Sequence, residues 1–114
     1  MRNLTQLNFR APSGRQISID VADSFISRFK GLMGRKEGNY GLLLISCNSI
    51  HTCFMRYPLD ILFLNDENQV VAIKRGVRPF HLVMPVKGAS KALEFPSSLH
   101  ASAFVKVGDI LNFY

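Results

Sequence analysis

Apolar and polar residues alternate in two segments near the start of the chain, residues 4–9 and residues 16–21. A period of two is typical of strands that bury one face and expose the other. Pro12, Ser13 and Gly14 lie between the two segments and have the chemistry of a turn. We therefore predict a β-hairpin at this end of the chain.

The period lengthens to that of a helix over residues 22–33. An apolar stripe with helical spacing is formed by Phe25, Ile26, Phe29, Leu32 and Met33. Asp23 suits the N-terminal end of a helix dipole, and Gly34 fits a C-terminal cap. Arg28 and Arg35 fall on one edge of the stripe, at the border between core and solvent. One amphipathic helix is therefore expected here.

The remainder of the chain has the pattern of short strands. Unbroken apolar runs at residues 42–45 and 61–64 are typical of strands covered on both faces. Turn residues at 66–68 are followed by a second apolar segment, which predicts a β-hairpin over residues 60–74. A last strand is expected at residues 110–113. Many short strands with one helix predict a mainly β domain, a β-sandwich or partly closed barrel.

Length and composition agree with one globular domain over residues 1–114. The apolar fraction of 47% excludes a disordered chain. The formal net charge is +6, but no run of cations exceeds two neighbours, and neither zinc-ligand spacing nor an aromatic RNA-binding signature is present. We therefore expect a basic, solvated surface, and the pattern disfavours nucleic-acid binding.

Two cysteines, Cys47 and Cys53, are fewer than an extracellular disulfide scaffold usually carries. The first ten residues lack the apolar core of a signal peptide, and no apolar run approaches the roughly 18 residues of a membrane span. The expected location is cytoplasmic, with reduced thiols and no transmembrane segment.

The segment from His51 to Arg56 is the densest cluster of reactive side chains. In an extended strand, His51, Cys53 and Met55 share one face, and these three residue types are ligands of soft metals. His51 and Met55 would then lie about 13 Å apart, too far for one metal ion. The leading interpretation makes Cys53 and Met55 core residues and His51 a structural hydrogen-bonding group, with no metal or cofactor.

Charged residues also occur inside apolar sequence, where an unpaired charge is costly. Asp60 opens the run 61–64, Arg56 precedes it by four residues, and Glu94 lies among Ala92, Leu93 and Phe95. Two interpretations stay open. Arg28, Arg56, Asp60 and Glu94 form an internal ion-pair network that locks the fold, or the arginines line a cleft for a carboxylate, a phosphate or a peptide terminus. Asp109, after Gly108, has ordinary turn chemistry.

At these residues the chain resembles a known family, the bacterial and archaeal domain of unknown function 192. The motifs that carry the resemblance are residues 28–35, residues 51–64, Pro79, residues 93–96 and Gly108-Asp109. It covers about residues 16–113 and implies a β-sandwich-like fold of jelly-roll character with a short helix. It implies no reaction, cofactor or substrate. Phe54 stands where many members have Trp, and Ser98 where many have Gly.

The positions that the resemblance carries over as candidate ligand-binding residues are Arg28, Arg35, His51, Met55, Arg56, Asp60, Glu94 and Asp109. We expect a non-enzymatic binding or accessory module with a groove between the helix at 22–33 and the strand at 49–56. Its partner would be a small anion or a peptide segment. The first alternative is a thiol- or metal-dependent hydrolase-type enzyme centred on Cys53 and His51. The second is a weak binder of nucleic acid or of a membrane surface.

Overall fold

The alternating segments at the start of the chain form the predicted hairpin, strands β1 (Thr5–Arg10) and β2 (Gln16–Ala22). A computed structural model describes residues 5–22, 38–45, 50–51 and 55–114. Its other elements are β3 (Tyr40–Ile45), β4 (Ile50–His51), β5 (Leu59–Leu64), β6 (Val70–Val77), β7 (Leu82–Val83), β8 (Lys91–Pro96) and the 3-10 turn η1 (Ser97–Leu99).

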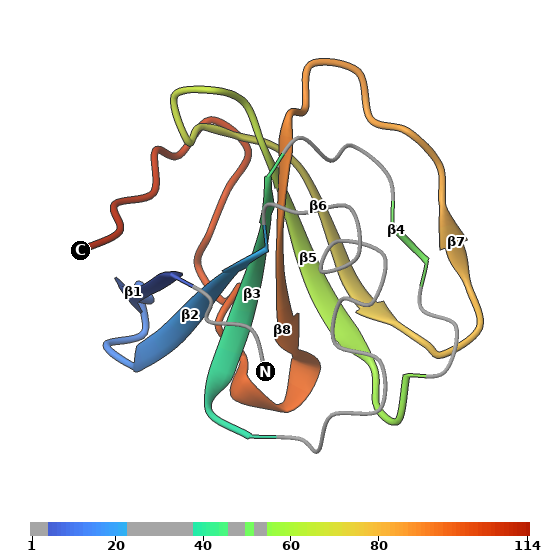
Figure 1. Ribbon diagram of the computed structural model, residues 1–114, viewed down its shortest axis with the longest axis horizontal. Helices are drawn as coiled ribbons and strands as arrows, with labels where there is room; N and C mark the ends of the chain where they lie inside the picture. Colours follow the sequence, from blue (N-terminus) through green and yellow to red (C-terminus); the bar gives the residue numbers. More distant parts are fainter. Residues whose placement is uncertain (1–4, 23–37, 46–49, 52–54) are drawn as a thin grey trace.

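Six of the strands form one sheet, in the order β1-β2-β3-β8-β5-β6 (Figure 1). Neighbouring strands are antiparallel except for the parallel pair β2–β3. The predicted hairpin over residues 60–74 is confirmed as the β5–β6 pair. Its turn is fixed by Asn65, whose side-chain oxygen accepts the backbone N–H groups of Glu67 and Gln69. The mainly β fold that the pattern predicts is therefore correct.

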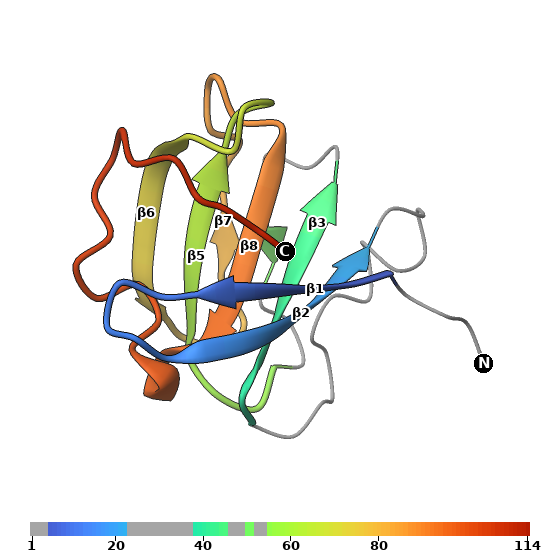
Figure 2. The same cartoon turned by 90° about the vertical axis from the view of Figure 1, so that its left-hand side faces the viewer.

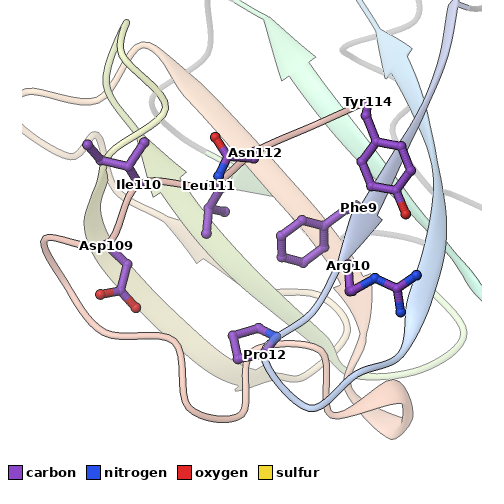
Figure 3. Close-up of a pocket in the computed structure, with 8 residues that line it drawn as sticks. All are labelled: Phe9, Arg10, Pro12, Asp109, Ile110, Leu111, Asn112 and Tyr114. Atoms are coloured by element: carbon purple, nitrogen blue, oxygen red, sulfur yellow. The ribbon is translucent and has the colours of Figure 1, made fainter.

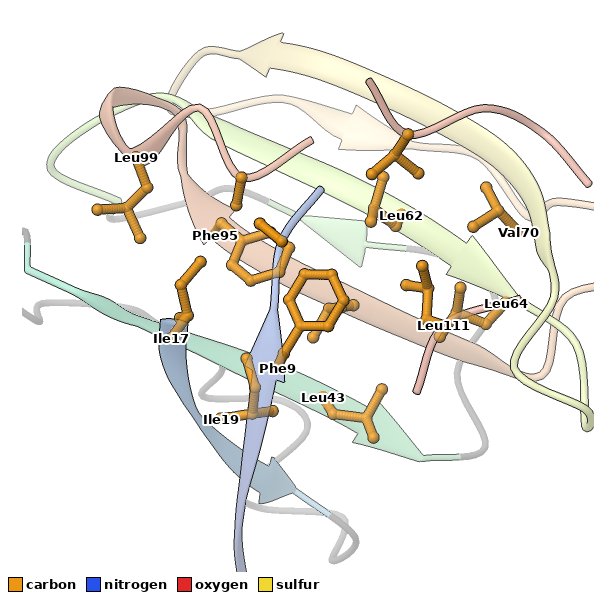
Figure 4. Close-up of a cluster of buried hydrophobic side chains, with 14 residues drawn as sticks. Phe9, Ile17, Ile19, Leu43, Leu62, Leu64, Val70, Phe95, Leu99 and Leu111 are labelled. Carbon is orange, nitrogen blue, oxygen red and sulfur yellow. The ribbon is translucent and has the colours of Figure 1, made fainter. Parts of the chain in front are cut away.

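Both faces of this sheet are covered, as the unbroken apolar runs predicted. All six residues of β5 are buried. Because side chains alternate along a strand, Leu62 and Leu64 enter one apolar cluster, and Ile61 and Phe63 enter another on the opposite face. Figure 4 shows the first cluster, which we call the hairpin-side core because Phe9 of β1 is stacked on Phe95 within it.

The second cluster, which we call the arm-side core, lies on the face of the sheet toward the small two-stranded sheet β4–β7 (Figure 1). Val83 of β7 packs against it, and it also contains buried Met55 and Tyr57. The Tyr57 hydroxyl shares a hydrogen bond of 2.7 Å with the Tyr40 hydroxyl. The protein is thus layered, with the large sheet in the middle.

The C-terminal residues 108–114 connect the two edges of the large sheet (Figure 2). Near β6, the Leu111 N–H donates to the Asn68 carbonyl, and near β1, the Tyr114 N–H donates to the Asn8 carbonyl. A continuous strand was expected at residues 110–113. This prediction is wrong, because only isolated bridges form at Ile110 and Phe113. The sheet itself is not closed, and this tail spans its edges.

The helix predicted over residues 22–33 lies outside the described residues except for Ala22, which ends β2. Of the strand predicted at 49–56, the structure describes β4, while Met55 and Arg56 belong to no strand. In the described ranges the 3-10 turn η1 is the sole helical element, and none of these ranges holds a helix able to cross a bilayer.

Gly41 of β3 has no room for a side chain. A Cβ atom at this position would lie 2.8 Å from the Phe95 ring and 2.9 Å from the Glu94 carbonyl oxygen. Since the carbonyl belongs to the neighbouring strand, it cannot move aside without breaking the sheet. Gly41→Ala is expected to lower the free energy of unfolding by about 2 kcal/mol, measured by urea denaturation. Ser18→Ala, at an exposed position of β2, is the control and should change stability by less than about 0.5 kcal/mol.

Candidate functional site

Asp60, the second residue of β5, is only 5% exposed and lies opposite Phe95 of β8. Its carboxylate accepts three hydrogen bonds from neutral donors. Oδ1 receives the Gly76 N–H at 2.9 Å and the Ser97 hydroxyl at 2.8 Å. Oδ2 receives the Ser102 hydroxyl at 2.8 Å. The buried carboxylate is thus stabilised by fixed dipoles, which is how a buried acid becomes tolerable.

A β-bulge brings the Gly76 N–H to this carboxylate. Leu59 and Ile61 of β5 pair with Val77 and Lys74 of β6, so β6 has one extra residue at this point. Gly76 adopts a φ of +65° there, a conformation that side chains disfavour. The bulge turns the Gly76 N–H toward Asp60, and it places Arg75 beside the loop that follows η1.

The Arg75 guanidinium is held against that loop by three hydrogen bonds. Nε donates to the Ser102 hydroxyl at 3.1 Å, and one Nη atom donates to the carbonyls of Ser102 and Val105 at 3.0 and 3.1 Å. The Ser102 hydroxyl accepts from Arg75 and donates to Asp60, so it separates the two charges. Within the described ranges, no ion pair joins Arg75 to Asp60, and the other Nη atom has no protein acceptor.

These groups surround a pocket of about 280 Å³, which we call the Asp60 pocket. It is lined by Asp60, Arg75, Ser97, His100, Ser102 and Ala103. His100 is exposed, and it adopts the left-handed conformation at the end of η1 with a φ of 53°. The sequence predicted Asp60 as a site residue, but not the cation and hydroxyls around it. The adjacent Arg75-Gly76 pair was a usable signal, because Gly inside a strand often marks a bulge.

Glu94 occupies the opposite face of the sheet. It pairs with Leu42 of β3 and Ile61 of β5, both of the arm-side core, and is 3% exposed. Among the residues that the structure describes, no group donates to its Oε1. Burial, which disfavours the charged form, raises the pKa of Glu94 from 4.5 to about 8. Asp60 and Glu94 therefore cannot belong to one ion-pair network, and that hypothesis is wrong for this pair.

The remaining predicted site residues do not gather around Asp60. Met55 is buried in the arm-side core, and Arg56 is exposed. The Asp109 carboxylate accepts the Lys106 N–H at 2.9 Å, which is the turn chemistry expected of it. The backbone of His51 pairs with Leu82. Arg28, Arg35, Cys47 and Cys53 lie outside the described residues, as does most of the predicted groove between residues 22–33 and 49–56.

A second hollow of about 430 Å³ lies between the β1–β2 hairpin and the C-terminal tail (Figure 3). It is lined by Phe9, Arg10, Pro12, Asp109, Ile110, Leu111, Asn112 and Tyr114. The Arg10 guanidinium donates to the Gly14 carbonyl and the Gln16 side chain, so it fastens its own hairpin. Asp109 likewise serves its own turn. These charges therefore have structural roles, and this hollow is the weaker candidate.

No metal centre is formed by the part of the chain that the structure describes, since it holds no group of three His, Cys, Asp or Glu side chains. The hydroxyls of Ser97 and Ser102 both donate hydrogen bonds to Asp60. Among the described residues, neither hydroxyl forms a hydrogen bond with a histidine ring. A serine nucleophile needs an adjacent base that is itself oriented. Among the described residues, the pocket thus provides polar groups that can form hydrogen bonds with a ligand.

The family model of domain of unknown function 192, described as "Uncharacterized ACR", matches residues 8–113. The chain belongs to this family. It is 33% identical over 100 residues to the UPF0127 protein of Thermococcus sibiricus and 34% identical over 106 residues to the UPF0127 protein PF1050 of Pyrococcus furiosus. These matches cover 82% and 87% of the chain, and 64% and 90% of the two relatives. The chain thus spans just under two thirds of the Thermococcus relative.

Two solved structures share the fold. The first is "a putative transcription regulator" from Sinorhizobium meliloti, with a TM-score of 0.81 and 19% identity over 99% of the chain and 97% of that protein. The second is a protein of unknown function from Novosphingobium aromaticivorans, with a TM-score of 0.76 and 22% identity over 96% of the chain and 84% of that protein. At these identities the likeness concerns the fold alone. The family and the fold of this DUF192 protein are thus established.

Proposed function

We propose that this DUF192 protein is a non-enzymatic binding module whose Asp60 pocket receives a small anionic group, a carboxylate or a phosphate. The observation that supports the proposal is the hydrogen bonding of the Arg75 side chain. Its guanidinium is fixed by three hydrogen bonds at the wall of a pocket, and, among the described residues, one Nη atom keeps two N–H donors without a protein acceptor. A pre-oriented guanidinium with free donors is suited to an oxyanion.

The polar groups around Arg75 support this assignment. Asp60 receives its hydrogen bonds from Gly76, Ser97 and Ser102 and, among the described residues, forms no ion pair with Arg75. His100 adds an exposed imidazole on the same pocket. The Ser97 hydroxyl, whose proton goes to Asp60, can accept a hydrogen bond from a ligand hydroxyl or ammonium group. The pocket volume suits a group the size of a side chain or a peptide terminus.

Binding of acetate and inorganic phosphate, followed by NMR on the amide signals, tests the proposal. Both anions are expected to shift the signals of Gly76, Ser97 and Ser102 in a saturable way. Arg75→Gln should weaken the stronger of the two interactions at least about ten-fold, because it removes the charge and the free donors. Arg75→Lys should give an intermediate loss, since it keeps the charge without the planar fork.

Arg10→Gln is the matched control, because it removes an arginine whose guanidinium is bound to its own hairpin. This variant should bind as the unmodified protein does. Equal weakening by Arg10→Gln and Arg75→Gln would reduce the effect to net charge and would contradict the proposed site. Amide signals of the pocket that do not move with either anion would also contradict it.

The other functions expected from the sequence stay predictions. A peptide groove beside residues 22–33 and a hydrolase centred on Cys53 and His51 both depend on residues outside the described ranges. A cytoplasmic location rests on the sequence alone. Of these alternatives, the membrane-surface binder is favoured by a separate feature of the described residues, the segment between β6 and β8.

A further inference from the structure

The connection from β6 to β8 carries a stripe of exposed apolar side chains. Phe80, Leu82 and Met84 are 70%, 67% and 66% exposed. They follow one another at every second residue through β7, while Val83 and Val86 pack against the arm-side core. Val83 and Val86 thus hold this segment against the arm-side core, while Phe80, Leu82 and Met84 present large apolar side chains to solvent. We call residues 78–87 the arm; Figure 1 shows β7 apart from the large sheet.

The sequence on both sides of this stripe is cationic. From residue 68 to residue 93 the chain contains no Asp or Glu, although it contains Lys74, Arg75, Arg78, Lys87 and Lys91. Arg78 and Lys87, at the two ends of the arm, are exposed, and so is Lys74 on β6. The arm is therefore apolar in its middle and has a cationic residue at each end, within a stretch of sequence that contains no Asp or Glu.

We infer that the arm docks on the surface of an anionic lipid bilayer. Apolar side chains gain free energy by leaving water for the boundary between headgroups and acyl chains. Lysine and arginine beside them are attracted to anionic headgroups, by about ten-fold in affinity for every one or two cations near the surface. Exposed apolar groups flanked by cations meet both requirements at once.

Two features favour lipid over the other occupants of such a surface. A second copy of the chain would bring another acid-free, cationic arm against the first, and like charges would repel. A protein strand added beside β7 would find a short edge, because Pro79 and Pro85 lack N–H groups and Phe80 has a φ of +65°. A bilayer needs neither backbone pairing nor a matched shape.

The protein offers an internal control for exposed apolar side chains. Phe104, Val107 and Ile110 are 77%, 63% and 62% exposed, but they belong to the segment that leads into the C-terminal tail. Asp109 lies next to Ile110 in sequence, and this segment runs on the opposite side of the molecule from β7 (Figure 1). If exposure alone caused lipid binding, these side chains would serve as well as the arm.

Sedimentation with vesicles of phosphatidylcholine containing about one-third phosphatidylglycerol tests the inference. The protein is expected to sediment with these vesicles at low salt, and at least ten-fold less with pure phosphatidylcholine or when salt rises from about 50 to about 500 mM. The triple variant Phe80→Ser, Leu82→Ser, Met84→Ser should lose at least about ten-fold in affinity. Lys74→Gln with Lys87→Gln should lose a similar factor.

The matched triple variant Phe104→Ser, Val107→Ser, Ile110→Ser should sediment as the unmodified protein does. Absence of binding to anionic vesicles at low salt would overturn the inference, as would equal losses in the two triple variants. Dimerisation in analytical ultracentrifugation that the arm variant abolishes, without vesicle binding, would overturn it in favour of a second copy. Circular dichroism and thermal melting confirm that each variant remains folded, so a loss of binding reports the surface.

Discussion

Glutamine in place of Glu94 is expected to stabilise this DUF192 protein at pH 8 by on the order of 4 kcal/mol, and to leave its stability near pH 4 almost unchanged. The reason is the buried carboxyl group on β8. Among the described residues, no group donates a hydrogen bond to its Oε1 atom. Glutamine has nearly the same shape and carries no charge at any pH, so it avoids the cost of ionisation in the arm-side core.

The direction follows from the raised pKa of Glu94, about 8 against 4.5 in the unfolded chain. Below pH 4.5 the carboxyl is protonated in both states, so ionisation costs the fold nothing. Between pH 4.5 and 8 the unfolded state releases this proton while the folded state keeps it. The free energy of unfolding therefore falls by about 1.4 kcal/mol per pH unit across this window, and it levels off above pH 8.

Urea denaturation of the protein and of Glu94→Gln at several values between pH 4 and pH 9 measures the effect. The difference between the two free energies of unfolding should grow with pH and then become constant. Glu67→Gln is the control, because Glu67 is exposed on the β5–β6 turn and water solvates it in both states. A difference that is the same at pH 4 and pH 8 would show that Glu94 does not ionise at the expense of folding.

Removing the Asp60 carboxylate is expected to destabilise the fold by about 3 to 4 kcal/mol, because Asp60→Ala leaves three donors without their acceptor. The hydroxyls of Ser97 and Ser102 can rotate toward other acceptors. The Gly76 N–H cannot, since the bulge in β6 fixes its direction. The largest part of the loss should therefore come from this backbone group and from the cavity left in the sheet.

Asp60→Asn separates charge from shape. The amide keeps an oxygen for Gly76 and Ser97 but presents an NH2 group where the Ser102 hydroxyl now donates. Because Ser102 also accepts from Arg75, its proton loses its acceptor, and we expect a loss of about 1 to 2 kcal/mol. Both variants are measured by urea denaturation at pH 7.

Asp66→Ala serves as the control for the loss of an acidic side chain. Asp66 is exposed and accepts the Ser90 hydroxyl at 2.6 Å on the surface. It should cost less than about 1 kcal/mol. If Asp60→Ala costs no more than Asp66→Ala, the hydrogen bonds around Asp60 contribute little to stability, and its burial needs another explanation.

The hydrogen bonds that stabilise buried Asp60 also position Arg75 in the proposed anion site. Ser102 transmits the position of Asp60 to Arg75, because its hydroxyl bonds to both. Asp60 therefore acts as a positioning residue, and Arg75 and His100 would touch the ligand. The Ser102 hydroxyl lies between the Asp60 carboxylate and the Arg75 guanidinium, so the charge of Arg75 is available to an anion in the pocket.

The pattern along the chain was sufficient for the elements that depend on local chemistry. Alternation predicted the β1–β2 hairpin, and turn residues between two apolar runs predicted the β5–β6 hairpin. The apolar neighbours of Asp60 and Glu94 marked both acids as unusual, and the structure shows that both are buried. The hydrophobic period and the turn residues determine structure over a few neighbouring positions, so they can be recognised without knowledge of the rest of the fold.

The sequence by itself thus determined the mainly β class and two hairpins, and it singled out two acids within apolar sequence. Only the tertiary structure decided what those acids do, because strand register places Asp60 opposite Phe95 and Glu94 opposite Ile61, on opposite faces of the sheet. A shift of one residue would reverse those faces. Arg75 comes from β6, and Ser97 and Ser102 come from η1 and the loop after it; both segments are distant from Asp60 in sequence and reach it through a bulge and a loop. Apart from Gly76, which marks the bulge, such long-range pairing leaves no local pattern, so the Asp60 pocket could be identified only in the folded chain.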